Sequence, residues 1–468
     1  MTRERSSALL LSKLLAACVW LTVSVFFVLE MLLKPISGED AFQQSCMAGS
    51  WSHLRECGEW VLDFIPRLGQ VVHYLIIWQF SSVPSFGLET VFRLSSALLS
   101  IFIIWMMVLI VLGRRPRLRL QDAGIAALAF ALLVLSDISQ VFFNGFSNVH
   151  NYVPIMSGLL VAVYSVISFD RMVVALGRPL AYAAVVVAFF TVTAGFDTNA
   201  LVVAVALVIL AVTRWKSSPG AGTWNVQVPW VTAIAGSVLG TWFFWILGNG
   251  WGSVTRPGAF AHHSGVDLES GLVHISVSLM GNMASHVAFY FPLVIVALIS
   301  VLVAIYDSRI SPQGARTLIV TTVTGLLSLL ALAPAGRIDG RVSALAYMLL
   351  CIPLLAMCLH LVKQVVPRVN ARVPAIAMTL ASLLLAGMTI DNTRLLVHNV
   401  QSARAAFETI SEVSCVDRQI ANLEAFRLES SLFSITRDEH SFSYVFSSWY
   451  GPSLNVNGQP VPIQEICP

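Results

Sequence analysis

Long apolar runs recur along most of the chain, and they constrain its fold more than any other feature. Each run covers about 16–25 residues, the length that an α-helix needs to cross a bilayer. Hydrophobic residues make up 57% of the 468 residues and charged residues only 11%, whereas a soluble domain carries about 25% charged residues. The sequence therefore predicts an all-α polytopic membrane protein with about eleven transmembrane helices. The predicted spans are 9–33, 90–112, 122–137, 153–169, 180–195, 199–213, 229–248, 287–305, 317–334, 342–362 and 374–390.

Basic residues mark alternate breaks between these spans and so predict the orientation. Lys and Arg concentrate in the short cytoplasmic loops of membrane proteins. This rule predicts a cytoplasmic N-terminus, and the odd number of spans then places the C-terminus in the periplasm, outside an inner (plasma) membrane. The residues concerned are Arg3, Arg5, Arg114, Arg115, Arg117, Arg119, Arg171, Arg178, Arg214, Lys216, Arg309, Arg316, Lys363, Arg368 and Arg372.

The chain divides into a transmembrane part, residues 1–390, and an outer segment, residues 391–468. After position 391 mixed polar and charged residues replace the apolar runs, and we expect a small periplasmic C-terminal α/β domain there. The predicted outer loops of the transmembrane part are 34–89, 138–152, 249–286 and 335–341. Within the first loop, apolar and aromatic residues from Trp60 to Phe80 predict a helix that lies on the membrane surface.

Four of the seven cysteines lie in the predicted periplasmic segments. Cys46 and Cys57 share the first outer loop, and Cys415 and Cys467 belong to the C-terminal segment. Disulfides can form in such an oxidising compartment, and the spacing leaves their pairing open. The net charge is only +3 and the topology accounts for the basic residues, so nothing indicates nucleic-acid binding.

Two adjacent carboxylates, Glu39 and Asp40, follow the predicted end of the first span. A carboxylate at this position can face a cleft at the membrane surface and act as a general base. The alternative is an ordinary solvated acidic turn, which the spacing alone favours slightly.

The predicted outer loop 138–152 is rich in amide, imidazole and aromatic groups. It contains His150, Asn151 and Tyr152, two residues before Pro154. Sugar-binding sites use this mixture, because aromatic faces stack on a pyranose while amides and imidazoles bind its hydroxyls. A capped turn with interfacial aromatic residues explains any single one of these residues about as well.

Two arginines, Arg337 and Arg341, lie in a break on the side where positive charge is normally depleted. A guanidinium matches the geometry of a phosphate, so these residues are candidates for binding a phosphorylated substrate. Arg93, near the outer end of the second span, is a weaker candidate of the same kind. The alternative for the late pair is an ion pair with Asp339.

The predicted outer loop 249–286 carries the adjacent histidines His262 and His263. Their spacing matches no metal-binding motif such as H-E-x-x-H, so no metal site is assigned. We expect a loop that covers a substrate. The sequence has no Walker A loop, no G-x-S-x-G elbow and no G-x-G-x-x-G, which argues against soluble nucleotides as substrates.

Together these features resemble the GT-C membrane glycosyltransferases, and most closely their O-antigen-modifying glucosyltransferases of serotype conversion. The likeness rests on the acidic pair Glu39 and Asp40, the loop from Asn148 to Pro154, the late outer arginine, the many spans and the outer C-terminal segment. The family's acidic pair is often Asp-Asp or Asp-x-Asp, and this chain has Glu-Asp instead.

The resemblance implies a bacterial enzyme that moves a sugar, with glucose expected, from a polyprenyl-phosphate carrier to a surface polysaccharide such as O-antigen. It implies that Asp40 is the catalytic base, with Glu39 as its alternative. A small flippase and a carrier-charging glycosyltransferase are implied partners. No cofactor is predicted, while the assistance of a divalent metal, the acceptor and the oligomeric state stay open.

Two other classes of membrane protein remain as alternatives. A transporter or flippase of a lipid-linked or polar solute would keep ionisable residues near the bilayer midplane. An O-antigen polymerase or ligase would also use outer loops and a polyprenyl carrier, but would depend more on arginines than on an acid of the first loop. The outer position of the polar groups favours the glycosyltransferase.

The predicted topology can be tested with a reporter fused after Asp391. A reporter that is active only after export, such as alkaline phosphatase, should be active there because this position follows the last predicted span. A reporter that is active only in the cytoplasm should stay inactive at the same position. The opposite result would mean that the predicted outer loops do not all lie on one side of the membrane. It would then remove the basis for grouping them.

Overall fold

A computed structural model of the chain describes eleven helices and four short strands, with intervening segments outside the description. The described residues are 2–33, 51–52, 55, 74–79, 88–134, 136, 138, 140–143, 146–195, 231–242, 272–307, 310–331, 340–365, 372–408, 415–416, 419–420, 453–456 and 459–462. The helices are α1 (Thr2–Leu33), α5 (Leu88–Leu112), α6 (Leu120–Val134), α7 (Gln140–Phe143), α8 (Phe146–Ile167), α9 (Phe169–Leu176), α10 (Arg178–Gly195), α15 (Leu272–Tyr306), α16 (Pro312–Ala331), α17 (Gly340–Val365) and α18 (Arg372–Glu408). A further helical segment covers Val231–Trp242.

The described part is nearly all helical, and its apolar helices support a membrane protein. Five helical stretches within it are long and apolar enough to cross a bilayer: Leu10–Leu33, Arg93–Leu112, Val149–Ile167, Ser343–Lys363 and Ile376–His398. Four shorter apolar helices accompany them. Each predicted span coincides at least in part with a helix, except 199–213, which lies outside the described residues. The number of eleven spans therefore stays a prediction.

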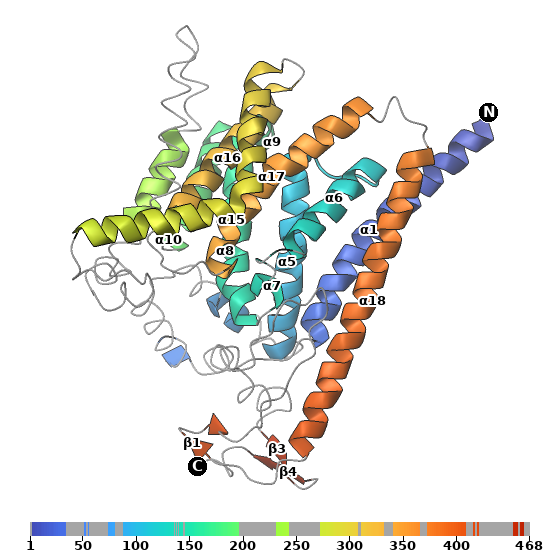
Figure 1. The fold of residues 1–468 in the computed structure, drawn as a ribbon, viewed down its shortest axis with the longest axis vertical. Coiled ribbons are helices and arrows are strands. Elements are labelled where there is room, and N and C mark those ends of the chain that lie inside the picture. Colours follow the sequence, from blue (N-terminus) through green and yellow to red (C-terminus); the bar gives the residue numbers. More distant parts are fainter. Residues whose placement is uncertain are drawn as a thin grey trace.

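Successive helices run up and down the bundle, with α1 and α18 side by side along one edge (Figure 1). One end of the bundle lies near the strands (Figure 1). Helix α1 ends there, and helices α5, α8 and α17 begin there. We call this the outer end, following the predicted orientation, and the opposite end the inner end. Two antiparallel hairpins follow α18: β1 (Cys415–Val416) with β2 (Gln419–Ile420), and β3 (Ser453–Val456) with β4 (Gln459–Pro462).

Several helices extend into segments that the sequence predicted as loops. The predicted outer loop 138–152 contains α7 and the first two turns of α8, and the predicted loop 249–286 contains the first turns of α15. Helix α18 continues through the predicted domain boundary at 390/391 as far as Glu408. Polar residues are an unreliable sign of a loop, because they also occur in helices wherever their side chains find partners or water.

Helix α15 changes direction along its length. Its first part lies across the bundle and its second part runs along it (Figure 1). Pro292 lies within the helix, and a proline there lacks an N–H and clashes with the preceding turn, which bends a helix.

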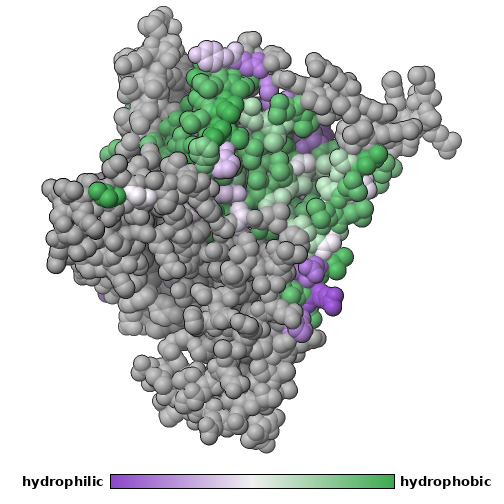
Figure 2. All heavy atoms as spheres, in the orientation of Figure 1, coloured by the Kyte–Doolittle hydropathy of each residue, from purple (hydrophilic) through white to green (hydrophobic). Residues whose placement is uncertain are grey.

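Apolar side chains both fill the bundle and cover its outside. Phe26, Phe27, Phe130 and Phe142 are buried together, with ring centroids 4.9–5.7 Å apart in the contacting pairs. The outer surface is also hydrophobic over a broad face, and hydrophilic residues lie toward its edges (Figure 2). A helix that is hydrophobic on all sides belongs in lipid, because water would not tolerate its outward face.

Two glycines bring the segment Val231–Trp242 close to α10. A Cβ added at Gly236 would lie 2.5 Å from the carbonyl oxygen of Val186, and one added at Gly240 would lie 2.5 Å from that of Phe190. The glycines are four residues apart, which is the G-x-x-x-G spacing that lets the backbones of membrane helices approach closely. This contact supports placing both segments within the membrane.

At the inner end, Gly113 connects three helices: it follows α5, and its partners belong to α9 and α16. It has a φ of 62°, a left-handed conformation that glycine adopts without strain. Its carbonyl accepts hydrogen bonds from Arg171 Nη1 and, at 3.3 Å, from Gln313 Nε2. Arg171 Nη2 in turn donates to Gln313 Oε1 at 3.0 Å. The end of α5, helix α9 and the start of α16 are therefore held together.

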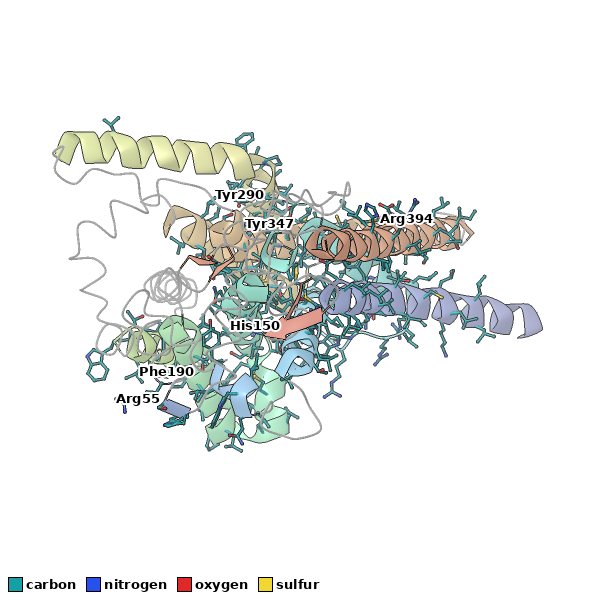
Figure 3. The ribbon with its side chains drawn as sticks, turned by 90° about the horizontal axis from the view of Figure 1, so that it is seen from below. Arg55, His150, Phe190, Tyr290, Tyr347 and Arg394 are labelled. Atoms are coloured by element: carbon teal, nitrogen blue, oxygen red, sulfur yellow. The ribbon has the colours of Figure 1, made fainter. Side chains whose placement is uncertain are left out.

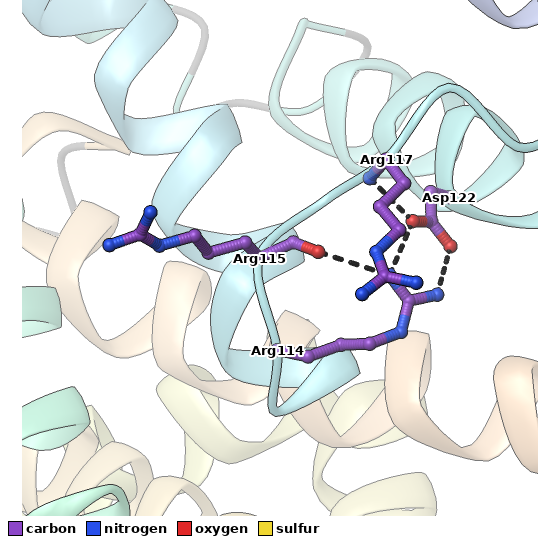
Figure 4. A network of polar contacts seen from close by, with 4 residues as sticks. All are labelled: Arg114, Arg115, Arg117 and Asp122. Atoms are coloured by element: carbon purple, nitrogen blue, oxygen red, sulfur yellow. Dashed lines mark hydrogen bonds and ion pairs between the residues drawn. The ribbon is translucent and has the colours of Figure 1, made fainter. Parts of the chain in front are cut away.

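A fully buried carboxylate, Asp122, organises the loop between α5 and α6 (Figure 4). Arg114 donates to both of its oxygens at 2.7 Å, and the backbone N–H of Arg117 donates at 2.8 Å. The hydrogen bond with Asp122 raises the pKa of Arg114, so this guanidinium stays charged. Charge-assisted, two-point contacts of this kind fix geometry as well as adding stability.

Replacing Arg114 with Ala should destabilise the protein by about 1–3 kcal/mol, because Asp122 would keep its buried charge and lose two donors. The apparent melting temperature in detergent should fall accordingly. Arg114→Lys should restore only part of the loss, since an ammonium does not make the two parallel bonds.

The matched control is Arg115→Ala, which removes an exposed arginine side chain from the same loop and should leave the melting temperature unchanged. Equal melting temperatures for Arg114→Ala and the unmodified protein would contradict a stabilising role for the pair.

Candidate functional site

Arg93 of α5 binds the outer end of α1. Its Nη1 donates to the carbonyl oxygens of Met31 at 2.8 Å and of Leu32 at 3.1 Å, and its side chain is buried. The last carbonyls of a helix have no partner within the helix, and the helix dipole makes that end negative. A buried guanidinium satisfies both needs at once, so Arg93 fixes where α1 ends.

Glu30 and Asn392 form a second buried contact at the same level. Both residues are almost inaccessible, with 0% and 3% of their surface exposed. Asn392 Nδ2 of α18 donates to Glu30 Oε2 of α1 at 2.7 Å. Burying a carboxylate in an apolar span is costly unless it is hydrogen-bonded, and this contact contributes one hydrogen bond to Glu30.

The third contact joins α5 to α8. Ser96 Oγ lies 2.8 Å from His150 Nε2, and both side chains are buried. Ser96 is one turn from Arg93 on the same face of α5. The side-chain oxygen of the next residue, Asn151, is buried and accepts no hydrogen bond from the described residues.

These buried polar side chains come from four helices, α1, α5, α8 and α18, and we call them the outer polar row. Its members are Glu30, Arg93, Ser96, His150 and Asn392. Each lies within six residues of the outer end of its apolar stretch. At 1.5 Å per residue, this places the row within about 9 Å of those ends, whereas the midplane of a bilayer lies about 15 Å from its surface. The row is therefore near the interface.

A second polar group lies between α15 and α17. Tyr290 donates its hydroxyl hydrogen to Ser343 Oγ, and its ring lies 5.8 Å from that of Tyr347. Viewed from the outer end, Tyr290, Tyr347 and His150 all lie toward the middle of the bundle (Figure 3). Tyr290 is at the bend of α15, so the contact also fixes the direction of that helix.

The structure describes only some of the predicted site residues. Arg93, His150, Asn151 and Tyr152 lie at the outer ends of α5 and α8, in helices rather than in a loop. Tyr152 is buried. Arg341 is the second residue of α17, and only its backbone is described. The predicted residues that lie outside the description are Glu39, Asp40, Arg337, His262 and His263.

Three members of the row were not among the sequence candidates: Glu30, Ser96 and Asn392. Glu30 could have been found, because a carboxylate inside an apolar run is rare and usually functional. Ser96 and Asn392 carry no such signal, because single small polar residues are common in membrane helices. Their importance comes only from the partners that the fold gives them.

The cysteines and metal-binding groups add little to this site. Cys18, Cys351 and Cys358 are free thiols within α1 and α17. Of the four cysteines in predicted periplasmic segments, only the backbone of Cys415, in β1, is described. Among the described residues, no group of three or more His, Cys, Asp or Glu side chains could hold a metal ion.

Comparison with known protein families found no match, and comparison with curated proteins found no significant relative. The geometry of the chain itself therefore carries the functional argument.

Replacing Arg93 with Ala should lower the apparent melting temperature by several degrees, because two carbonyls at the end of α1 would lose a charged donor worth about 1.5–3 kcal/mol per bond. The melting temperature of Arg93→Lys should lie between those of Arg93→Ala and the unmodified protein. Leu94→Ala, at an outward-facing neighbour, is the matched control and should have little effect. An unchanged melting temperature with a weakened donor affinity would instead support the phosphate-binding role that the sequence predicted for Arg93.

Proposed function

We propose that this chain is an integral membrane glycosyltransferase that moves a sugar, with glucose as the first candidate, from a polyprenyl-phosphate carrier to a surface polysaccharide such as O-antigen. The observation that carries the proposal is the outer polar row, a buried set of ionisable and amide groups at one end of an apolar bundle. Such groups are costly in a membrane and are usually kept for function.

The depth of the row supports chemistry at the surface over transport. A transporter places its binding groups near the midplane, often on broken helices, so that either side can reach them. Here the row lies close to one set of helix ends, where α1 ends and α17 begins. In the sequence, Glu39 and Asp40 follow α1 by a few residues, and Arg337 and Arg341 stand close to the start of α17. A lipid-linked donor also has its reactive phosphate at this depth, because its tail occupies the hydrocarbon.

The proposed reaction is a single displacement at the anomeric carbon of the donor sugar. Asp40 removes the proton from an acceptor hydroxyl as its oxygen forms a bond to that carbon. The bond between the anomeric carbon and the phosphate oxygen breaks, and polyprenyl phosphate leaves with the electron pair. Arg341 and Arg337 stabilise the negative charge that develops on the leaving phosphate.

The sugar is assigned to the start of α8. Asn151 offers a buried carbonyl oxygen that can accept a bond from a sugar hydroxyl, while the rings of His150 and Tyr152 lie next to it in sequence. His262 and His263 are assigned to the segment that covers the donor. These polar contacts are stronger near the membrane than in water because the effective dielectric is lower.

The proposal includes a location and partners. The chain resides in the bacterial inner membrane with its N-terminus in the cytoplasm and its C-terminal segment in the periplasm. Its donor is charged on the cytoplasmic side by another glycosyltransferase and moved across by a small flippase. The four strands described after α18 lie at the outer end (Figure 1), where a polysaccharide acceptor would approach.

Asp40→Asn tests the proposal. It should lower turnover by about 100- to 10,000-fold, the usual contribution of a general base, because the amide cannot take a proton at neutral pH. Membranes containing each variant would be given a radiolabelled polyprenyl-phosphate sugar and the acceptor polysaccharide, and transfer would be measured at equal expression.

Glu39→Gln is the matched control and should reduce turnover much less. The reverse ranking would assign the base to Glu39 instead. If both variants transfer sugar at the unmodified rate, the acidic pair is a solvated turn and the enzyme loses its proposed centre. Movement of the labelled donor across the membrane without transfer would favour a flippase.

A further inference from the structure

The short segment between α5 and α6, residues 113–119, lies at the depth of lipid headgroups. It follows the apolar stretch Arg93–Leu112 directly, and α6 begins at Leu120. The 20 residues of that stretch span about 30 Å at 1.5 Å per residue, which is the thickness of the hydrocarbon core. The segment therefore leaves the hydrocarbon and returns to it within the headgroup layer of the inner end.

Asp122 fixes the backbone in the first half of this segment. Its carboxylate holds Arg114, whose Nη1 also donates to the carbonyl oxygen of Arg115 at 3.0 Å. The ring of Pro116 restricts the next φ, and the N–H of Arg117 donates to Asp122 at 2.8 Å. The side chain of Arg115 is exposed and points away from this network (Figure 4). The backbone is thus held while the guanidinium stays at the surface.

A tight turn fixes the second half of the segment. The N–H of Arg119 donates to the carbonyl oxygen of Arg117 at 2.8 Å, which closes a three-residue turn with Leu118 at its centre. The carbonyl oxygen of Arg119 accepts from the N–H of Ala123 at 3.0 Å, in the first turn of α6. Both arginine side chains are exposed, and Leu118 between them is 51% exposed. The turn therefore presents two cations on either side of an apolar side chain.

The carboxylates near this segment are already paired. Each carboxylate side chain that the structure describes at the inner end has a basic partner at 2.7–3.6 Å; the pairs are Arg114–Asp122, Arg316–Asp170 and His360–Asp307. Within the described part of the chain, the guanidiniums of Arg115, Arg117 and Arg119 have no carboxylate partner. Their positive charge is therefore complementary to an anion outside the chain.

We infer that Arg115, Arg117 and Arg119 form a binding site for the phosphate of an anionic phospholipid in the leaflet at the inner end. A guanidinium makes two parallel hydrogen bonds with phosphate oxygens, and phospholipid phosphates occupy the layer in which the segment lies. Leu118, exposed between two of the arginines, contacts the start of the acyl chains.

The fixed backbone distinguishes this site from a basic loop that only orients the chain. Orientation requires positive charge near the helix ends, and a flexible loop supplies it equally well. A backbone that is already held loses less conformational freedom when a ligand binds, which favours affinity for one headgroup. The site requires neither sugar transfer nor a given orientation of the chain in the membrane.

Titration of the purified full-length protein with a defined lipid tests the site. The protein in a neutral detergent receives dioleoyl-phosphatidylglycerol, native mass spectrometry measures the bound lipid, and the apparent melting temperature is recorded. A ligand that binds only the folded state raises that temperature. Dioleoyl-phosphatidylcholine, whose headgroup has no net charge, should bind more weakly and stabilise less. Equal binding of the two lipids would contradict a site for an anionic lipid.

The triple variant Arg115→Gln, Arg117→Gln and Arg119→Gln should weaken phosphatidylglycerol binding by about 100-fold, because each basic residue near a membrane surface contributes about fivefold. In detergent without lipid it should melt like the unmodified protein, since the backbone hydrogen bonds remain. Lysines at the three positions keep the charge and should restore part of the affinity, because an ammonium lacks the paired donors. Unchanged affinity in the glutamine variant would overturn the inference.

The matched control removes three other exposed charges from the inner end. Lys13→Gln, Arg178→Gln and Lys363→Gln, combined in one variant, lie on α1, α10 and α17. This variant loses the same net charge as the first and should bind phosphatidylglycerol nearly as well as the unmodified protein. Equal losses in the two triple variants would show that only the general charge matters, and would overturn a site between α5 and α6.

Soluble phosphates separate a lipid site from a site for a free anion. Inorganic phosphate and glycerophosphate carry the anionic group without acyl chains, so each should raise the melting temperature less than phosphatidylglycerol does at the same concentration. If either one stabilises the protein as strongly as the lipid, and loses that effect in the glutamine variant, the site binds a soluble phosphate and its assignment to a lipid is wrong.

Discussion

The bilayer offers no water to hydrogen-bond a polar group, and the rest of this structure depends on that constraint. Every backbone N–H and C=O within the hydrocarbon must find a partner inside the chain, which selects helices. The constraint is hardest to meet at helix ends, where carbonyls lack intrahelical partners. At the outer end of α1 a buried arginine from α5 meets it, so the packing of the two helices follows from the satisfaction of a few backbone atoms.

The same constraint explains which features could be predicted from the sequence. Apolar length is a direct record of the bilayer thickness, so the runs ending at Leu33 and Leu112 predicted the ends of α1 and α5. Polarity was a poorer guide to helix ends. The first turns of α8 contain an asparagine, a histidine and a second asparagine, and they are helical because a helix needs hydrophobic residues only where it meets lipid or a core.

The candidate site was predictable in its location and less so in its contacts. Arg93 was singled out because an arginine is unusual at the outer end of a span, but its observed acceptors are backbone carbonyls, which leave no mark in a sequence. Glu30, by contrast, can be recognised in the sequence, because its carboxylate lies inside an apolar run. Its partner Asn392 is 362 positions away, and no local pattern connects two residues so far apart.

The two ends of the bundle solve different problems. At the inner end, Arg171 and Gln313 meet at the carbonyl of Gly113, and these contacts join the end of α5 to α9 and to the start of α16. These contacts hold the helices in place. At the outer end the contacts join helix to helix, at the level where Asn151 has a buried oxygen without a partner among the described residues. A binding site needs both properties, because a polar group recognises a ligand only if the elements that carry it are already held in place. The contacts at the inner end therefore fix the helices, and the positions of the outer helix ends decide where the polar side chains of the outer row lie.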